Sequence, residues 1–508
     1  MIAQLIILLT VLYFLYHHFF GKRLLYPPGP TPLPFVGNLH QLGADFGQWA
    51  ATFSRWGDEY GGVFTVWMPN PTVMVTDLQL MRDSFAGQHN DALSGRAFNY
   101  SLDFILRGKH GVFYSEGALW REQRRFTLHV LRDFGFGRNL MQEKINTEVD
   151  RLIEFIESKR TATSKTSTLS MELPLSVCIA SIIANIVYGE QYAYEGDARF
   201  ERMNNVNRLI FEMLSRADLM MLREYPWLKH LPVAGHFGQT FLDNLRVDFE
   251  ELFREAIAKR RQMLAENPEI EPLDFTTAYL KEQNRRSKNQ EPEGTFTDWQ
   301  LYATVFDLWS AGMETTTTTL RWALLYMCLY PHIQSKVRQE LRDVLRGRRC
   351  ALTDKLALPY TNAVLHETQR HANIVPLNGQ HQVDRDVEIG GKRIRKGSTV
   401  IAQIAAVLQD ERYFENAAEF RPERFLSGDG TNVQLLTAET EKVLAFGVGK
   451  RRCLGESMAR QEMLLIFATL VQRYRISVHV ASTAPDPTRP VHYFTKQPSY
   501  HEIVFESL

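Results

Sequence analysis

The sequence is short of cysteine, with only Cys178, Cys328, Cys350 and Cys453 among 508 residues. So few and so widely spaced cysteines exclude a disulfide framework and favour a reducing compartment. Net charge is also absent, because 58 Lys and Arg residues balance 58 Asp and Glu residues. A chain without net charge has no overall electrostatic attraction to nucleic acid, and we predict no nucleic-acid partner.

An obvious linker is missing as well. Hydrophobic residues make up 44% of the chain and aromatic residues 11%, which supplies a large core and excludes disorder as the main state. Length alone would suggest about three domains. Because no linker interrupts the chain, we predict instead one large domain over residues 35–508.

Charged residues are missing from residues 1–21, and the run from Leu5 to Phe20 is mostly apolar. A helix of this length spans roughly 30 Å, which is enough for one membrane crossing. A cleaved signal peptide is the alternative, but the basic start and the small-x-small cleavage site that it requires are not visible. We predict a membrane anchor over residues 1–20. Lys22 and Arg23 then place the rest of the chain in the cytosol.

Residues 21–34 follow the predicted anchor and combine two basic residues with five prolines. Proline fixes φ and removes an amide donor, so the proline-rich part of this segment, residues 26–34, cannot be helical. We predict a stiff spacer between the anchor and the large domain. A proline-rich ligand for another domain is the alternative.

The large domain has the pattern of a mainly α fold with a small β region. Helical periodicity dominates residues 120–155, 200–263 with a break near 226–238, and 299–330. Two hairpins are predicted, one from strands at 63–67 and 72–76, the other over 387–394 with Gly-Gly at its turn. The polar stretches 158–170 and 281–298 have no sustained apolar face, and we predict surface loops there.

Cys453 lies directly before a helical pattern at residues 457–471. Free amides at a helix amino terminus and three neighbouring cations favour thiolate over thiol. Gly447 and Gly449 permit φ above zero and hence a tight turn around the sulfur. Such a thiolate can be a nucleophile or a soft metal ligand, but no local Cys/His pattern supports nucleophilic catalysis. A small core residue is the third reading.

The residues around this cysteine form the pattern F-x-x-G-x-R-x-C-x-G, with Phe446, Gly449, Arg451, Cys453 and Gly455 in the fixed positions. This segment resembles the haem-ligand loop of the cytochrome P450 superfamily, the haem-thiolate monooxygenases. The resemblance implies the cytochrome P450 fold, haem b as cofactor and Cys453 as axial iron ligand, because thiolate favours O–O cleavage. It also implies that Arg451 pairs with a haem propionate, that Phe446 covers the proximal face and that Gly455 contacts the cofactor.

A second motif is Glu367-x-x-Arg370, followed by Arg424 within a P-E-R-F segment. The E-x-x-R spacing alone is common on helix surfaces and carries little information. Its place before the cysteine resembles the family arrangement. The resemblance implies a buried charge network of these three residues that supports the haem-ligand loop.

A third motif is A-G-x-E-T at Ala311 to Thr315, inside the predicted helix 299–330. Small residues let a ligand approach the helix backbone, and threonine can bond to the carbonyl four residues earlier. A helix with a threonine-rich face is the alternative reading. The resemblance implies that Ala311 contacts haem and that Glu314 and Thr315 are catalytic, delivering protons during oxygen activation.

A fourth motif is W-x-x-x-R at Trp120 and Arg124, which share one face of a helix. It resembles the pattern beside the haem propionates in the family. Arg96 and His381 stand where microsomal relatives place further propionate contacts. For Arg96 and His381, the alternative is a structural role in which the side chain bonds to the protein rather than to a cofactor.

Substrate contacts are implied by the resemblance alone. They are Phe104, Val112 and Phe113 in the predicted loop before Trp120, Asp307 in the long helix, Val375 and Leu377 after the E-x-x-R helix, and Phe494. Most are apolar, as a pocket for hydrophobic compounds requires. Asp307 either orients a polar group of the substrate or accepts hydrogen bonds from the neighbouring fold.

Electrons must come from a partner, because we find neither a P-loop nor a dinucleotide fingerprint. The resemblance implies an NADPH-dependent flavoprotein reductase, with cytochrome b5 as a second candidate. A local basic face suits an acidic partner, with an ordinary solvated charge cluster as the alternative. The residues proposed for that face are Arg121, Arg125, Arg132, Lys442, Lys450 and Arg452.

Together these patterns predict a monooxygenase that inserts one oxygen atom of O2 into a lipid, fatty acid, steroid or xenobiotic. We expect a single-pass protein of the endoplasmic reticulum membrane, in contact with lipid, with its catalytic domain facing the cytosol. A haem-binding sensor or carrier without turnover is the alternative. A thiol hydrolase using Cys453 is a third hypothesis, and it predicts no haem.

Overall fold

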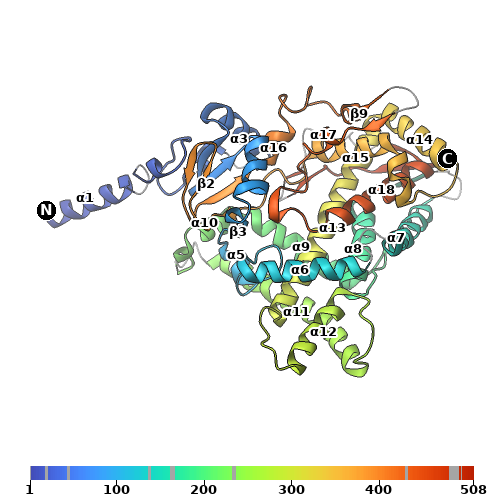
Figure 1. Cartoon of the computed structure of the whole chain (residues 1–508), viewed down its shortest axis with the longest axis horizontal. Helices are drawn as coiled ribbons and strands as arrows, with labels where there is room; N and C mark the ends of the chain where they lie inside the picture. The colour runs from blue at the N-terminus through green and yellow to red at the C-terminus, as the bar shows by residue number, and fades with distance from the viewer. Residues whose placement is uncertain are drawn as a thin grey trace. The chain divides into compact units, whose positions relative to one another are not determined.

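The computed structural model describes residues 2–17, 21–42, 46–134, 139–160, 166–230, 236–428, 433–479, 491–492 and 495–508. Helices predominate and the sheets are small, as Figure 1 shows, which confirms the predicted mainly α class. The chain forms two compact units, each assembled from three segments. The first unit comprises Met1–Phe98, Val375–Ala418 and Leu444–Cys453; the second comprises Asn99–Ile374, Glu419–Val443 and Leu454–Leu508.

The first unit is built around a five-stranded sheet with the order β1-β2-β8-β5-β3. These strands are β1 (Val63–Met68), β2 (Asn70–Val75), β8 (Thr399–Ala402), β5 (His381–Gln382) and β3 (Gly95–Arg96). The helical elements are α1 (Ile2–Tyr16), η2 (Lys22–Leu25), α2 (Leu39–Leu42), α3 (Phe46–Tyr60), α4 (Leu78–Met81), η3 (Arg82–Gln88), η4 (Ala92–Ser94), α16 (Ile404–Leu408) and η8 (Gly449–Arg451). The sheet therefore joins strands that are about 300 residues apart in the sequence.

Both predicted hairpins are confirmed in this unit. Strands β1 and β2 pair antiparallel, with Val63 opposite Val75. Strands β6 (Val387–Ile389) and β7 (Lys392–Ile394) also pair antiparallel. Gly390 and Gly391 at their turn have φ of 55° and 72°, which favours glycine at both positions.

The amino-terminal helix α1 ends at Tyr16, and none of its residues is buried. Met1 and residues 18–20 of the predicted anchor lie outside the described residues. Among the residues that the structure describes, no helix combines the length and the apolar character needed to cross a membrane.

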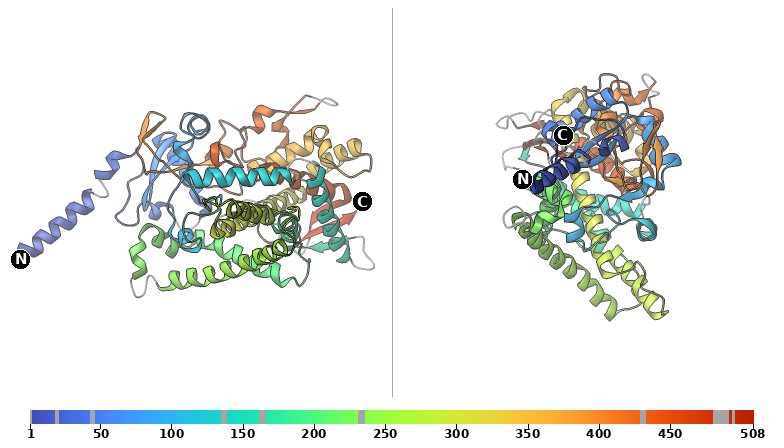
Figure 2. Two further views of the ribbon diagram at one scale, coloured as in Figure 1. Left: turned by 60° about the horizontal axis from the view of Figure 1, so that its bottom comes forward. Right: turned by 90° about the vertical axis from the view of Figure 1, so that its left-hand side faces the viewer.

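The second unit is mostly helical. Its helices are α5 (Tyr100–Ile105), α6 (Gly117–Asp133), α7 (Asn139–Ser158), α8 (Glu172–Tyr188), α9 (Ala198–Ser215), α10 (Ala217–Glu224), η5 (Pro226–His230), α11 (His236–Glu266), α12 (Phe275–Lys288), α13 (Asp298–Leu329), α14 (Pro331–Leu345), η6 (Leu352–Ala357), α15 (Pro359–Ala372), η7 (Pro422–Phe425), α17 (Thr437–Thr440) and α18 (Glu456–Arg473). Its strands are β4 (Thr166–Leu169), β9 (Leu426–Ser427), β10 (Gln434–Leu435), β11 (Tyr474–Val478), β12 (Val491–His492), β13 (Lys496–Gln497) and β14 (Ile503–Ser507). Strands β11, β14 and β4 form a three-stranded sheet in that order. The long helix α11, green in Figure 2, packs against α5, α9 and α10.

Helix α13 is the central element of the second unit. Its first turn is fixed by Thr297, whose hydroxyl oxygen accepts the backbone N–H of Gln300 at 3.1 Å. It packs against α8, α15 and α18, and Figure 1 shows α8 beside it. A Cβ at Gly312 would lie 2.8 Å from Cδ1 of Ile183 on α8, so glycine permits the close approach of the two helices.

The two polar stretches are not simply loops, and the prediction for them was wrong in part. Residues 166–169 form strand β4, while residues 281–288 continue α12. The end of α12 needs no apolar face because ion pairs stabilise it. Glu282 pairs with Arg285 at 2.8 Å and with Arg286 at 2.9 Å, at spacings of three and four residues.

Candidate functional site

The four cysteines differ sharply in their exposure. Cys178 and Cys350 are buried and Cys328 is half-buried, whereas Cys453 is exposed. Burial raises the pKa of Cys328 and of Cys350 to about 12, and raises the pKa of Cys178 as well. These three thiols therefore remain protonated. Cys453 is the cysteine whose sulfur is accessible to a ligand.

The loop that carries Cys453 is closed by its own backbone. The N–H of Cys453 donates to the carbonyl of Phe446 at 2.8 Å, and the N–H of Arg452 donates to that of Gly449 at 3.0 Å. The φ angles of Gly447 and Gly449 are 80° and 79°, which confirms the predicted turn. A Cβ at Gly449 would lie 2.0 Å from the carbonyl oxygen of Phe85, so no larger residue fits.

Helix α18 begins at Glu456 with Gly455 as its N-cap, which confirms the predicted helix after the cysteine. A Cβ at Gly455 would meet no protein atom within 4 Å. The protein therefore leaves open space beside this glycine.

Three basic side chains converge in the first unit. Arg96 and His381 are directly paired across strands β3 and β5, and both are buried. Arg96 donates to the carbonyl of Gln380 at 3.3 Å, and Arg451 donates to that of Ser94 at 2.8 Å. Burial, reinforced by the charges of Arg96 and Arg451, lowers the pKa of His381 to about 3. The unit thus gathers two cations and a neutral imidazole, a set suited to an anion.

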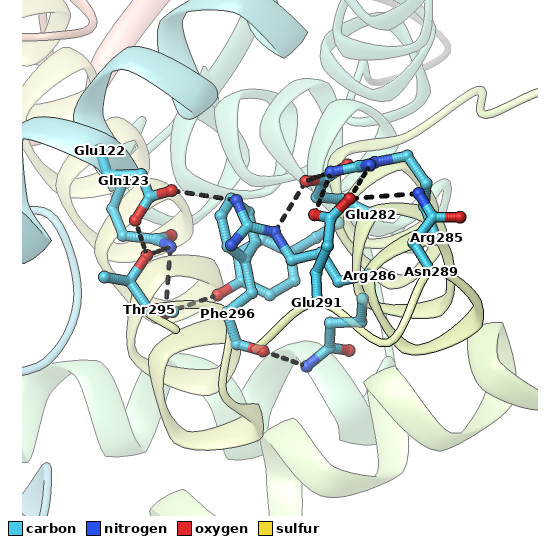
Figure 3. Close-up of polar contacts among 11 residues, drawn as sticks. Glu122, Gln123, Glu282, Arg285, Arg286, Asn289, Glu291, Thr295 and Phe296 are labelled. Carbon is cyan, nitrogen blue, oxygen red and sulfur yellow. Dashed lines mark hydrogen bonds and ion pairs between the residues drawn. The ribbon is translucent and has the colours of Figure 1, made fainter. Parts of the chain in front are cut away.

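In the second unit, Trp120 and Arg124 share one face of α6, as predicted. The guanidinium lies 5.8 Å from the centroid of the Trp120 ring, and this ring is buried. The adjacent residues fix the helix, as Figure 3 shows. Glu122 accepts from Arg286 at 3.0 Å and from the hydroxyl of Thr295 at 2.6 Å.

Gln123 adds a second anchor for α6. Its side-chain amide donates to the carbonyl of Thr295 at 3.0 Å and to the hydroxyl of the same residue at 2.8 Å (Figure 3). Gln123 and Trp120 are both buried. The helix that presents Trp120 and Arg124 is therefore held in place by α12 and by the segment that precedes α13.

The A-G-x-E-T motif interrupts the burial of α13. Ala311 is exposed and Thr315 half-buried, in the middle of a helix whose other residues are mostly buried. The hydroxyl of Thr315 donates to the carbonyl of Ala311 at 2.7 Å, the i−4 bond expected from the sequence. Small residues and an exposed turn leave this part of the helix open to a ligand.

The side chain of Glu314, from the same turn, contacts the carboxyl-terminal segment. Its Oε1 accepts from the hydroxyl of Thr495 at 2.8 Å and from the side-chain amide of Gln497 at 2.7 Å. Burial raises the pKa of Glu314 above its ordinary value. Sequence reasoning missed Thr495 and Gln497 because they lie about 180 residues further along the chain and belong to no motif.

Glu367, Arg370 and Arg424 lie together, as predicted, in a buried network. Oxygens of Glu367 accept from Nε of Arg370 at 2.7 Å and from Nε of Arg424 at 3.1 Å. The side chains of Glu367 and Arg370 are fully buried. The backbone N–H of Arg421 donates to the same carboxylate at 2.8 Å. The network fixes the segment before η7 to helix α15.

Comparisons with known proteins agree with this geometry. The cytochrome P450 family model matches residues 27–505. The chain belongs to the cytochrome P450 family.

Its similar relatives include cytochrome P450 2D20 of Mesocricetus auratus, which is 35% identical over 91% of this chain and 89% of the relative. Cytochrome P450 2K1 of Oncorhynchus mykiss is 34% identical over 94% of this chain and 91% of the relative. Cytochrome P450 2D6 of Homo sapiens is 35% identical over 94% of this chain and 93% of the relative. This cytochrome P450 is thus an oxidoreductase, a monooxygenase of the haem-thiolate class.

The residues present fit the haem that the family implies. A haem offers iron, which takes a soft thiolate, and two propionates, which take cations. The first unit supplies the accessible sulfur of Cys453 together with the convergent side chains of Arg96, Arg451 and His381.

The predicted substrate contacts of this cytochrome P450 are distributed over both units. Val375 and Leu377 belong to the first unit and are half-buried. In the second unit, Val112 and Phe113 lie in a turn, but Phe104 lies on helix α5 rather than in the predicted loop. Phe104 packs under a cation, since the Arg246 guanidinium is 4.5 Å from its ring centroid. Phe494 lies outside the described residues.

Asp307 has a clear local role in the structure. Its Oδ2 accepts the backbone N–H of Val112 at 2.7 Å and that of Phe113 at 2.9 Å. A Cβ at Gly111 would lie 2.2 Å from this oxygen. Of the two readings of Asp307, the hydrogen bond to the neighbouring fold is present. It ties the turn at residues 111–113 to α13.

Proposed function

We propose that this cytochrome P450 inserts one oxygen atom of O2 into a hydrophobic small molecule, a lipid, fatty acid, steroid or xenobiotic. Residues 35–508 act as one catalytic domain, and NADPH supplies electrons through a flavoprotein reductase. The observation that carries the proposal is the exposed Cys453 in its closed loop, in a chain that also has the A-G-x-E-T turn on α13. The apolar character of the predicted substrate contacts supports the substrate class.

Haem, when bound through Cys453, supplies the activation of dioxygen. The residues of the chain supply the rest. Arg96, Arg451 and His381 hold the carboxylates of the cofactor, and Trp120 and Arg124 do so from α6. Glu314 holds a proton and passes it toward the exposed turn at Ala311. Through its hydroxyl, Thr315 orients the group that accepts this proton.

The test is the carbon-monoxide difference spectrum of the reduced protein beside that of Cys453→Ser. We expect the far-red Soret band of thiolate ligation in the wild type and its loss in the variant. Cys328→Ser is a matched control that should keep the band, because its thiol is protonated and half-buried. A band that survives in Cys453→Ser would overturn the ligand assignment.

We propose further that the reductase docks on a basic face that includes helix α6. Arg121, Arg125 and Arg132 are exposed there, and within the described residues no carboxylate pairs with them. Lys442 and Lys450 are less available, because they pair with Glu439 and with Asp91. Unpaired cations attract an acidic partner more strongly than paired ones.

Charge reversal tests this docking surface. Arg121→Glu and Arg125→Glu should each weaken reductase binding several-fold and flatten its dependence on salt. Lys450→Glu should have a smaller effect because Asp91 already offsets the lysine. Cytochrome b5 titrated in the same assay shows whether it competes for this face. Unchanged reductase affinity in both arginine variants would contradict the proposal.

We also propose that the chain is anchored in the endoplasmic reticulum membrane by residues 1–20, with the remainder in the cytosol. The uncharged apolar run and the basic pair after it support this topology. The spacer at residues 21–34 then separates the anchor from the catalytic domain.

A further inference from the structure

Glu314 is held by a segment from the far end of the sequence. Thr495 is buried, and its hydroxyl donates to Oε1 of Glu314, as does the side-chain amide of Gln497. Within the described part of the chain, both side-chain hydrogen bonds to Glu314 end on this one oxygen. Oε2 is therefore the oxygen left to carry a proton.

The orientation of the Gln497 amide is fixed by chemistry. Arg321 donates from one guanidinium nitrogen to Oε1 of Gln497 at 3.2 Å. Arginine has no acceptor, so the carbonyl oxygen of the amide must face it. The NH2 group consequently faces Glu314, at 2.7 Å. Gln497 therefore links the buried Arg321 guanidinium to the half-buried Glu314 carboxyl, and the amide can take only one orientation between them.

The same segment is attached to α13 at several points. The indole N–H of Trp322 donates to the carbonyl of Lys496 at 2.9 Å. Arg321 also donates to the carbonyl of Pro498 at 3.4 Å and to Glu172 at 2.9 Å. The backbone N–H of Lys496 donates to the carbonyl of Ile374 at 2.8 Å. Residues 495–498, which we call the carboxyl-terminal strap, therefore have a defined position on the helix.

We propose that Thr495 and Gln497 are positioning residues for the reaction: the strap fixes the Glu314 carboxyl in one rotamer, with Oε2 available for proton transfer. This inference rests on the proposed role of Glu314 in proton delivery. It adds Thr495 and Gln497, which belong to no sequence motif, to the residues that act in proton delivery. It also makes the strap a determinant of how completely oxygen reduction is coupled to substrate oxidation.

The strap acts by position and charge and does not conduct protons. Neither the amide of Gln497 nor the guanidinium of Arg321 releases a proton near neutral pH. Burial raises the pKa of Glu314, while the two hydrogen bonds and the charge of Arg321 lower it and Glu172 raises it. Lys496 carries its ammonium 5.7 Å from the Trp322 ring centroid. The strap therefore favours the ionised carboxyl, against the effect of burial.

The experiment compares Gln497→Leu and Thr495→Val, which remove one donor each at nearly constant volume, in the haem-loaded full chain. Gln472→Leu is a matched control, because within the described residues the side chain of this half-buried glutamine bonds to the carbonyl of Arg348 and to no carboxyl. The Glu314 carboxyl band is identified by infrared difference spectroscopy against Glu314→Gln and is titrated with pH. Hydrogen peroxide formed per NADPH consumed is measured in parallel with the reductase, and the carbon-monoxide spectrum verifies haem ligation.

We expect the Glu314 midpoint to rise by about 1 to 2 pH units in Gln497→Leu, because a hydrogen bond to a charged group is lost. Peroxide yield should rise several-fold in both strap variants and stay unchanged in Gln472→Leu. If Glu314→Gln raises peroxide yield but the strap variants change neither readout, the positioning role is wrong. If Glu314→Gln itself leaves coupling unchanged, the proposed proton delivery by Glu314 fails.

Discussion

At the scale of single residues, Glu367 is the side chain on which the buried charge of α15 depends. It forms ion pairs with both Arg370 and Arg424 and accepts a backbone N–H from Arg421. Glu367→Gln would leave buried cations without an anion, and we expect a loss of about 3–5 kcal/mol in unfolding free energy. Urea unfolding followed by circular dichroism measures it.

The control for this prediction is Lys336→Met. Lys336 also pairs with a glutamate, Glu423, at 2.7 Å, but both side chains are substantially exposed. Its loss should cost less than about 1 kcal/mol. Equal effects of the two substitutions would show that burial of the Glu367 network does not determine its contribution.

Gly449 makes a second prediction at this scale. Gly449→Ala places a methyl group 2.0 Å from the carbonyl oxygen of Phe85 and forces alanine to φ of 79°. We expect the loop to open, with loss of the thiolate Soret band and a lowered melting temperature. Gly455→Ala has an ordinary φ of −88° and open space, so its melting temperature should stay within a few degrees of wild type.

At the scale of elements, α18 carries a fully buried carboxyl, Glu462, next to α13. The hydroxyl of Thr316 donates to it at 3.4 Å. Burial raises the pKa of Glu462 from 4.5 to about 8. The folded state thus keeps a proton that the unfolded state releases above pH 4.5. The stability that this proton contributes is complete below that pH and is lost as the pH rises toward 8.

Glu462→Gln removes this dependence. Between pH 5 and pH 8 the unfolding free energy of wild type should fall relative to the variant, by at most about 1.4 kcal/mol per pH unit. Urea unfolding at pH 5, 6.5 and 8 checks this expectation. Parallel pH profiles for the two proteins would mean that Glu462 titrates alike in the folded and unfolded states.

The helices also show which elements a sequence pattern alone can predict. The long helix predicted at residues 299–330 is α13 (Asp298–Leu329), because its apolar periodicity is strong and Thr297 caps it. The end of α12 was missed, since ion pairs rather than an apolar face stabilise it. Local patterns therefore predict elements that are stabilised by burial better than elements stabilised by surface charge.

At the scale of the whole molecule, the amino terminus gives a prediction about location. A chain lacking residues 1–21 loses the uncharged apolar run. We expect the full chain to remain in the membrane pellet after alkaline carbonate extraction and the shortened chain to move to the supernatant. Its thiolate Soret band should be unchanged. Retention of the shortened chain in the pellet would mean that another segment binds the membrane.

Sequence patterns could predict only those parts of the candidate site whose residues lie close together in short motifs. The loop of Cys453 and the turn at Ala311 are continuous in the chain, so each could be identified by its resemblance to a short motif of the family. The partners of Glu314 and of Asp307 are about 180 and 195 residues away, respectively, from the residues that they hold. Such pairs depend on tertiary packing, and no local pattern encodes them.

The order of segments in the first unit also has a consequence for biosynthesis. This unit takes its sheet from strands within residues 63–96 and 381–402 and packs Gly449 against Phe85, with residues 99–374 inserted between. Contacts of such high sequence separation form slowly and only once both partners exist. A ribosome must therefore complete nearly nine-tenths of the chain before Cys453, the proposed iron ligand, can reach its place in this unit.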